Sequence, residues 1–251
     1  MKKILTIILV SYIGLIFSDD HEMSAPTFLP LEIQQCNFNG NKDMDDFMNL
    51  IDDWNELLDA NSEYSYSGWV LTPQYRSEAN FSFDFGWLGV SNSWSEYGGI
   101  YDVWLKEAGP LAAKFEKIRS CKTQTLFAGQ TIRSAKTRSD SGVLIVSNCT
   151  LNQGITPMDL AEADAKYNAY LDSIDSEGGI YRWFPGLGAP TDADYTFKNV
   201  QSASSMSEWG EASEAFVNGG GLMAQVSIYG EIVSCDSGRM YFSDNVRDVR
   251  N

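Results

Sequence analysis

Histidine is almost absent from this chain of 251 residues: the single example, His21, lies close to the N-terminus. Catalysis by a Ser-His-Asp or Cys-His group needs a histidine inside the folded part of the protein. Structural zinc sites use closely spaced pairs of cysteine or histidine. The sequence therefore excludes these catalytic groups, and we expect no metal site.

Basic residues are also scarce. The chain has 18 Lys and Arg against 34 Asp and Glu, a formal net charge of −16. A nucleic-acid backbone would repel such a protein, so nucleic acid is excluded as a partner. The acidic residues are scattered along the chain and form no tail, so solubility is the simplest explanation of the charge.

The sequence has no apolar run of ordinary membrane-spanning length. Its apolar stretch from Ile4 to Phe17 is shorter than the roughly 20 residues that a bilayer span needs. Lys2-Lys3 precedes this stretch and Asp19 begins a polar segment after it, as in a secretory signal peptide. We predict a signal peptide over 1–18 and a loose leader over 19–30; a retained anchor is the alternative. Cleavage would leave a secreted or periplasmic protein with no stable membrane anchor.

The four cysteines are few but regularly placed. Cys36 and Cys121 are 85 positions apart, and Cys149 and Cys235 are 86 apart. In an exported protein an even number of cysteines favours disulfide bonds. We predict the pairs Cys36–Cys121 and Cys149–Cys235; a metal site is the alternative, but no two cysteines are close in sequence.

Other residues recur at nearly the same offset as the cysteines. Trp69 returns as Trp183, and Ser95-Glu96-Tyr97-Gly98 returns as Ser207-Glu208-Trp209-Gly210. The offsets lie between 112 and 114, which indicates an internal duplication of one module. We place the first module at 31–134 and the second at 142–251, joined by a polar linker.

Hydrophobic periodicity predicts the same order of elements in each module, strand–helix–strand–strand–helix–strand. Asp43 and Thr156 are suited to cap the first helix of each module, and Gly109-Pro110 should interrupt a helix. The predicted strands are 31–38, 64–75, 81–91 and 123–132, then 143–149, 180–184, 195–200 and 239–246, with a hairpin loop at 76–80. The fold class is thus α+β, with two βαββαβ ferredoxin-like modules.

Two such modules with amphipathic helices and aromatic-rich sheets resemble the dimeric α+β barrel superfamily. The resemblance implies that the two sheets pack face to face as an intrachain barrel with helices outside, and that the protein is a monomer because its halves pair within the chain. Members include cofactor-free monooxygenases, isomerases and haem enzymes. Those haem enzymes use a proximal histidine, and since His21 lies in the leader we expect no cofactor.

The densest aromatic cluster is the candidate ligand pocket. It would bind a small apolar ligand with a polar contact from Asn37, Asn39 or Asp84. Its aromatic candidates are Trp69, Phe83, Phe85 and Trp87. The alternative is that these rings fill the barrel and the core between sheet and helices, since aromatic residues dominate core burial.

Several charged residues also recur in both modules. Glu96 and Glu208 could act as an acid–base pair, but acidic residues are common in the first turn of a helix. Arg133 and Arg247 could clamp a carboxylate, although a structural pair with a neighbouring acid is the simpler interpretation.

No catalytic motif stands out. We therefore expect an exported, disulfide-stabilised protein with a non-enzymatic binding or structural role. The alternative is a cofactor-independent monooxygenase or isomerase that acts on a small apolar substrate in an aromatic pocket. The enzyme requires an open cavity with a polar side chain facing into it.

Overall fold

The computed structural model describes residues 26–75 and 82–249. Its first half follows the predicted order of elements, with each helical region divided in two. The elements are β1 (Leu29–Phe38), α1 (Met44–Met48), α2 (Ile51–Asp59), β2 (Ser67–Gln74), β3 (Phe85–Val90), α3 (Trp94–Glu107), α4 (Gly109–Ile118) and β4 (Arg119–Arg133). The predicted hairpin loop at 76–80 and the predicted signal peptide lie outside the described residues.

The second half repeats the order, and here the last strand is divided. Its elements are β5 (Ser141–Leu151), α5 (Pro157–Ser173), β6 (Gly179–Pro185), β7 (Phe197–Ala203), α6 (Met206–Val217), α7 (Gly221–Tyr229), β8 (Val233–Cys235) and β9 (Arg239–Arg247). The segment 222–233 is mostly the helix α7.

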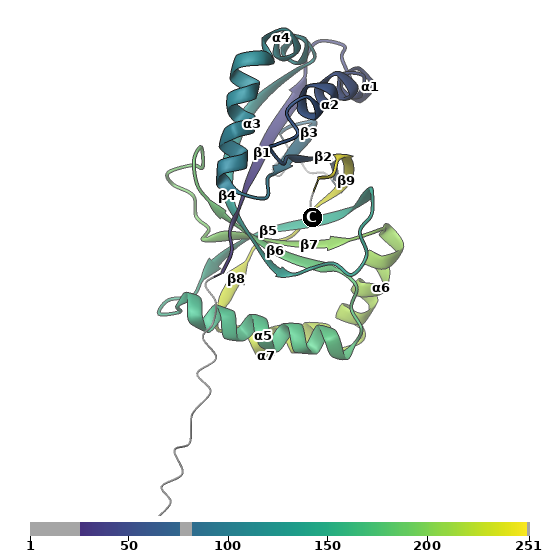
Figure 1. Ribbon diagram of the computed structural model, residues 1–251. Helices are drawn as coiled ribbons and strands as arrows, with labels where there is room; N and C mark the ends of the chain where they lie inside the picture. Colours follow the sequence, from purple (N-terminus) through teal and green to yellow (C-terminus); the bar gives the residue numbers. More distant parts are fainter. Residues whose placement is uncertain (1–25, 76–81, 250–251) are drawn as a thin grey trace, which may run out of the picture.

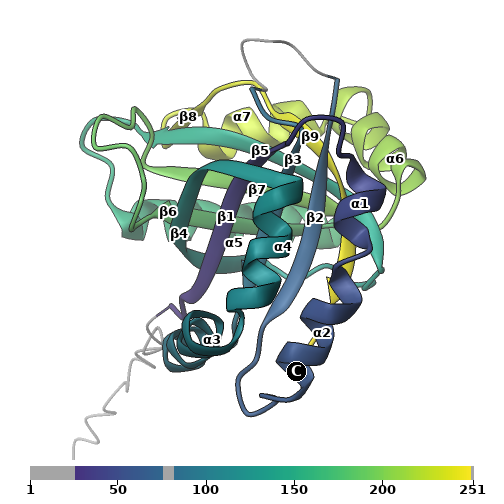
Figure 2. The same cartoon turned by 90° about the horizontal axis from the view of Figure 1, so that it is seen from above.

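Eight strands close into an antiparallel barrel in the order β7-β6-β4-β1-β3-β2-β9-β5, and β5 pairs with β7 to complete the ring. The short strand β8 pairs with β5 beside the ring. Strands of the two halves pair at β4–β6 and at β2–β9. Helices α1–α4 cover one side of the barrel and α5–α7 cover the opposite side (Figures 1 and 2). The α+β barrel expected from the sequence is confirmed.

Strand alternation divides the buried residues into layers. Successive side chains of β1 point in turn into the barrel and toward the helices, so Leu31 lies in the barrel core and Cys36 lies in the core between sheet and helices. The sheet–helix core of the first half is dominated by aromatic residues, among them Phe47, Phe85 and Trp87. Because helices cover the outer face of the sheet, both faces of these strands are buried.

Both predicted disulfides are present. Cys36 bonds Cys121 between neighbouring strands β1 and β4, and Cys149 bonds Cys235 between β5 and β8. Each bond therefore ties the first strand of a half to the start of its last strand. No group of three or more His, Cys, Asp or Glu that could hold a metal ion occurs within residues 26–75 and 82–249.

The predicted helix caps are also present. Asp43 and Thr156 each form a capping box with the residue three positions later. The backbone N–H groups of Glu96 and Glu208 donate to Ser93 and Ser205, so both glutamates lie in first turns. Gly109 begins a separate helix, as expected from Gly109-Pro110.

The two repeated arginines join the halves. Arg133 on β4 pairs with Asp172 on α5, with an Nη1–Oδ1 distance of 2.6 Å. Arg247 on β9 pairs with Asp59 on α2, with an Nη1–Oδ1 distance of 2.7 Å. Both are structural ion pairs, and each crosses one seam of the barrel. None of the helices among the described residues is long and apolar enough to cross a membrane.

Candidate functional site

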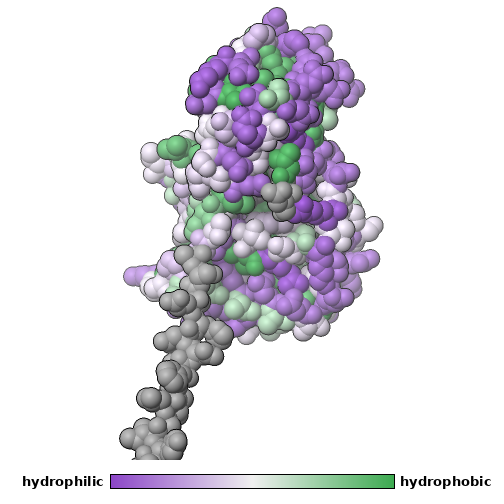
Figure 3. All heavy atoms as spheres, in the orientation of Figure 1, coloured by the Kyte–Doolittle hydropathy of each residue, from purple (hydrophilic) through white to green (hydrophobic). Residues whose placement is uncertain are grey.

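The first half contains a cavity of about 510 Å³ between its sheet and its helices. This volume lies in the range of small-molecule sites. The wall formed by the sheet carries polar groups, and the helices supply mainly apolar side chains. Its lining includes Glu32, Gln34, Tyr66, Trp87, Arg119 and Gln124. In Figure 3, apolar patches interrupt the hydrophilic surface of the upper, helical part of the molecule.

Glu32 is the central polar group of this cavity. Leu31 and Ile33, its neighbours on β1, belong to the barrel core, so alternation directs Glu32 toward the helices. The side chain is only 4 % exposed. A buried carboxylate is costly unless hydrogen bonds compensate for the water it has lost.

Four donors supply those hydrogen bonds. The side-chain amides of Gln34 and Gln124 donate to Oε1 of Glu32, the latter at 2.6 Å. The hydroxyls of Tyr66 and Tyr97 donate to Oε2, at 3.1 and 3.4 Å. The carboxylate is therefore held in one orientation from both sides.

The two tyrosines stay protonated in this environment. Burial raises the pKa of Tyr66 well above its ordinary value, and the nearby charge of Glu32 raises it further. The pKa of Tyr97 is raised for the same two reasons. Trp87 Nε1 donates to the Tyr66 hydroxyl at 3.0 Å, which leaves the Tyr66 proton for Glu32. A chain of donors thus runs from Trp87 through Tyr66 to the carboxylate.

Arg119 places a positive charge in the same cavity. Its Nη1 donates to Oε1 of Gln34 at 2.8 Å and to Cys36 Sγ at 3.0 Å, and its guanidinium lies 5.5 Å from the centre of the Phe47 ring. Burial lowers the pKa of Arg119, while the charge of Glu32 acts in the opposite direction. Its Nε is buried without a hydrogen-bond partner in the described part of the chain.

The absence of a side chain at Gly89 provides the space that the Tyr66 ring occupies. A Cβ atom at Gly89 on β3 would lie 1.8 Å from the Tyr66 hydroxyl oxygen. Any larger residue at this position would displace Tyr66 from its place between Trp87 and Glu32. Gly89 is therefore a packing requirement of the site.

The six pocket candidates chosen from the sequence are not brought together. Trp69 and Phe83 lie in the barrel core, and Phe85 is fully buried between sheet and helices. Of the six, Trp87 alone lines the cavity around Glu32.

The two polar candidates lie at the end of β1. Asn37 Nδ2 donates to the carbonyl oxygen of Ser82 at 3.4 Å. Asp84 accepts a hydrogen bond from the backbone N–H of Phe38 at 2.9 Å. These contacts hold the end of β1 against the approach to β3, and a ligand-binding role for either residue stays a prediction.

Sequence reasoning missed Glu32, Gln34 and Arg119. In an isolated strand, polar residues that alternate with Leu31 and Ile33 indicate a solvent-facing side. In a barrel whose outer face is covered by helices, the same positions are buried. A buried polar position on β1 was thus available as a signal once the barrel had been inferred.

The second half lacks this constellation. Ile145 precedes Cys149 by four residues, as Glu32 precedes Cys36. Instead, Arg182 and Asp164 form a buried ion pair, and Tyr229 donates to Asp164 at 2.7 Å. Burial, with the charge of Asp164, raises the pKa of Tyr229. The adjoining cavity of about 250 Å³ is half the volume of the first, and its charges satisfy one another.

Comparisons with known proteins identify the architecture. No family description and no curated protein matches the sequence. Among solved structures, a heme-binding protein from Thermus thermophilus aligns with 7 % identity and a TM-score of 0.52, over 87 % of this chain and 91 % of that chain. A proposed monooxygenase from Lactobacillus acidophilus aligns with 8 % identity and a TM-score of 0.52, over 88 % and 95 %. A dye-decolorizing peroxidase from Bacteroides thetaiotaomicron aligns with 9 % identity and a TM-score of 0.51, over 90 % and 95 %.

These similarities show that the chain has the fold of the dimeric α+β barrel superfamily, as the sequence resemblance implied. They also correct one expectation. We expected a non-enzymatic binding or structural role, but the proteins of like structure are described as a peroxidase, a monooxygenase and a heme-binding protein. The enzymatic alternative agrees better with these comparisons.

Proposed function

We propose that the chain is a cofactor-independent enzyme that transfers a proton to or from a small, largely apolar substrate in the cavity around Glu32. The observation that carries this proposal is a 4 % exposed carboxylate that faces an aromatic-lined cavity of about 510 Å³. A well-formed apolar pocket with a few convergent polar groups is the default location of an active site.

Glu32 is the proton acceptor in this proposal. Tyr66 and Tyr97 remain protonated because their pKa values are raised, and Arg119 is a donor. Glu32 would remove a proton from a carbon next to a carbonyl group, or from a phenolic hydroxyl. The electron pair of the broken bond then moves onto the substrate oxygen.

Arg119 would stabilise that oxygen anion. A positive group aimed at the position where negative charge develops is an effective source of catalysis. Return of the proton to another carbon completes an isomerisation. In a monooxygenase, the substrate anion would instead donate electrons to molecular oxygen. Deprotonation is common to both reactions, so we assign that step to this site.

The residues do not fit a histidine-ligated haem. Iron in haem proteins is bound by His, Cys, Met or Tyr. The cavity lining contains no His or Met, and its cysteine, Cys121, is in a disulfide. Of its two tyrosines, Tyr66 is committed to Glu32 and Trp87, and its raised pKa opposes the phenolate form that would bind iron. We therefore derive no step through haem.

We also propose export, with removal of 1–18 as a signal peptide and a secreted or periplasmic location. Two disulfides that close within the chain support an oxidising compartment. The shared order of elements supports tandem modules at 31–134 and 142–251, and barrel closure within one chain supports a monomer. We propose no nucleic-acid partner and no stable membrane anchor. The mass of the protein recovered from the medium or periplasm tests cleavage near Ser18.

The proton transfer can be tested without knowing the natural substrate. Small aromatic ketones and phenols are first screened by the fluorescence of the tryptophans, since Trp54, Trp87 and Trp104 line the cavity. Each ketone that binds is then incubated in D₂O, and exchange of its acidic C–H is followed by NMR. We expect the wild type to accelerate exchange and Glu32→Gln to abolish the acceleration while binding persists.

Glu116→Gln is the matched control. Glu116 also lines the cavity, but its side chain is exposed and forms no hydrogen bond or ion pair with the Glu32 network among the described residues. Exchange should be unchanged in this variant. If the Glu32→Gln variant catalyses deuterium exchange into the ketone as fast as the wild type, Glu32 is not the base.

A further inference from the structure

A further cavity, besides those next to Glu32 and Arg182, lies at one end of the barrel interior, on the opposite face of the sheet from Glu32. Its volume is about 330 Å³. Ile33 and Gln35 of β1 face it, whereas Glu32 and Gln34 face the helices, so the two cavities are separated by the thickness of the sheet. The proposed proton transfer does not use this space.

The cavity is amphipathic. Apolar groups of the barrel core form its floor, including Leu71, Val146 and Trp183. Polar groups gather at its rim: Gln35, Asn148, Lys198, Asp236 and Arg239. Asp236 is 42 % exposed, so this rim reaches solvent.

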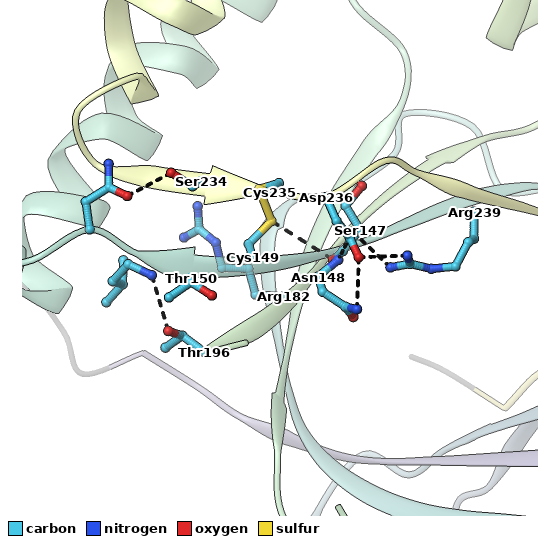
Figure 4. The surroundings of a disulfide bond; sticks show 12 residues. Ser147, Asn148, Cys149, Thr150, Arg182, Thr196, Ser234, Cys235, Asp236 and Arg239 are labelled. Atoms are coloured by element: carbon cyan, nitrogen blue, oxygen red, sulfur yellow. Dashed lines mark hydrogen bonds and ion pairs between the residues drawn. A yellow bond between two sulfur atoms is a disulfide. The ribbon is translucent and has the colours of Figure 1, made fainter. Parts of the chain in front are cut away.

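Asp236 is already neutralised by Arg239. Both terminal nitrogens of the guanidinium donate to the carboxylate, at 2.8 and 3.1 Å. Asn148 adds two hydrogen bonds, from its backbone N–H at 2.7 Å and its side-chain amide at 3.0 Å. Figure 4 shows these three residues converging beside the strand that carries Cys149. Burial acts to raise the pKa of Asp236, but these hydrogen bonds outweigh burial and lower it.

Lys198 is left without such a partner. It forms no ion pair with any residue in the described part of the chain. Its ammonium donates to Asn148 Oδ1 at 2.7 Å and lies 4.3 Å from the centre of the Tyr195 ring. Its pKa is lowered to about 8, first by burial and then by the positive charge of Arg239, while Asp236 and Asp194 act in the opposite direction.

We propose that this cavity binds a small amphipathic monoanion, a carboxylate with an apolar tail. Lys198, Arg239 and Asp236 together carry one net positive charge, which a single carboxylate would balance. The head would accept hydrogen bonds from the ammonium of Lys198, and the tail would lie on the apolar floor against Trp183. The ligand supplies the negative partner that a half-buried ammonium otherwise lacks.

Octanoate is a suitable probe, and octanol is its uncharged counterpart. Titration calorimetry on the intact protein should show octanoate binding about ten-fold more tightly than octanol, because only the carboxylate forms charge-assisted hydrogen bonds. Lys198→Met keeps an unbranched side chain that is one atom shorter and removes its charge, and it should abolish that preference. Lys198→Arg should retain most of it.

Three controls locate the binding. Lys166→Met changes an exposed lysine on α5 and should leave the octanoate affinity unchanged. Val146→Phe fills the floor and should weaken octanoate; its circular dichroism must match the wild type. Glu32→Gln should leave octanoate binding unchanged. A failure of octanoate to bind is therefore distinguishable from a failure of proton transfer at Glu32.

Two results would overturn the proposal. Equal affinities for octanoate and octanol would show that Lys198 does not bind the carboxylate. Displacement of octanoate by sodium sulfate at matching concentrations would show that the tail contributes nothing, which would leave a simple anion site.

Discussion

Replacement of Glu32 provides the sharpest test of how the first cavity is held together. Glu32→Leu keeps a side chain of similar volume but removes the acceptor of four hydrogen bonds. Glu32→Gln keeps the shape and one carbonyl oxygen. The two variants therefore separate the loss of charge from the loss of all hydrogen bonding at this position.

The expected magnitude follows from which donors can turn to water. Gln124 is exposed and Gln34 and Tyr97 are half-buried, so their groups can be hydrated through the cavity. Tyr66 is only 8 % exposed, and its hydroxyl proton would lose its acceptor. One buried unsatisfied group costs about 1–3 kcal/mol. We therefore expect Glu32→Leu to lower the free energy of unfolding by roughly 3 kcal/mol, since weaker losses at the other donors add to this.

Glu32→Gln should cost less. If the new amide nitrogen faces Tyr66 and Tyr97, their hydroxyls can rotate to accept from it, so about 1–2 kcal/mol is lost. Urea unfolding with disulfides intact gives the free energies, and equal slopes against denaturant concentration show that the same surface is exposed. Glu116→Gln should stay within about 0.5 kcal/mol of the wild type.

The order of stability is the critical result: wild type, then Glu32→Gln, then Glu32→Leu. If Glu32→Leu were as stable as the wild type, the hydrogen bonds around the carboxylate would not stabilise the fold. The donors would then be oriented by their other contacts, and the reasoning about this network would be wrong.

Three further outcomes are expected. Gly89→Ala should displace Tyr66, because the new Cβ would lie 1.8 Å from its hydroxyl oxygen, and aromatic ligands found in the fluorescence screen should bind at least several-fold more weakly; unchanged affinity would contradict this. Cys149→Ser with Cys235→Ser opens a loop with a sequence separation of 86, and should lower the free energy of unfolding by about 4 kcal/mol; a loss below about 1 kcal/mol would refute the loop-entropy argument. Lys198 has a pKa of about 8 when folded, below the ordinary 10.5, because of burial and a neighbouring guanidinium. The unfolded chain therefore binds more protons between these values, so the stability of the wild type relative to Lys198→Met should rise with pH from about 8 to 10. A flat difference in urea unfolding would show that burial does not shift this lysine.

The two halves use one scaffold in different ways. The first half keeps an open cavity whose charges, on Glu32 and Arg119, are linked through Gln34. In the second half, Arg182 lines the adjoining cavity, but its charge is already paired with Asp164. A direct ion pair has a structural role, whereas separated charges that line a cavity can act on a bound molecule.

Local patterns in the sequence determined much of the fold. The alternation and periodicity of apolar residues predict the order of strands and helices, and residues such as Asp43 and Thr156 mark helix starts through short-range hydrogen bonds. The disulfide pairs followed from the spacing of the cysteines, because each pair joins strands of one half. These features depend on neighbours in sequence or on a repeated order of elements.

The tertiary structure alone decided the location of the candidate site. Strand alternation indicates that Glu32 and Leu31 face opposite ways, but whether the outer face meets water or helices depends on how the barrel closes and where α1–α4 pack. Tyr66, Trp87 and Arg119 come from three different parts of the chain and meet Glu32 only in the folded protein. The scarcity of histidine in the sequence already excluded histidine-dependent catalysis. A buried carboxylate that faces a cavity could be recognised only from the structure, in which both faces of β1 are covered.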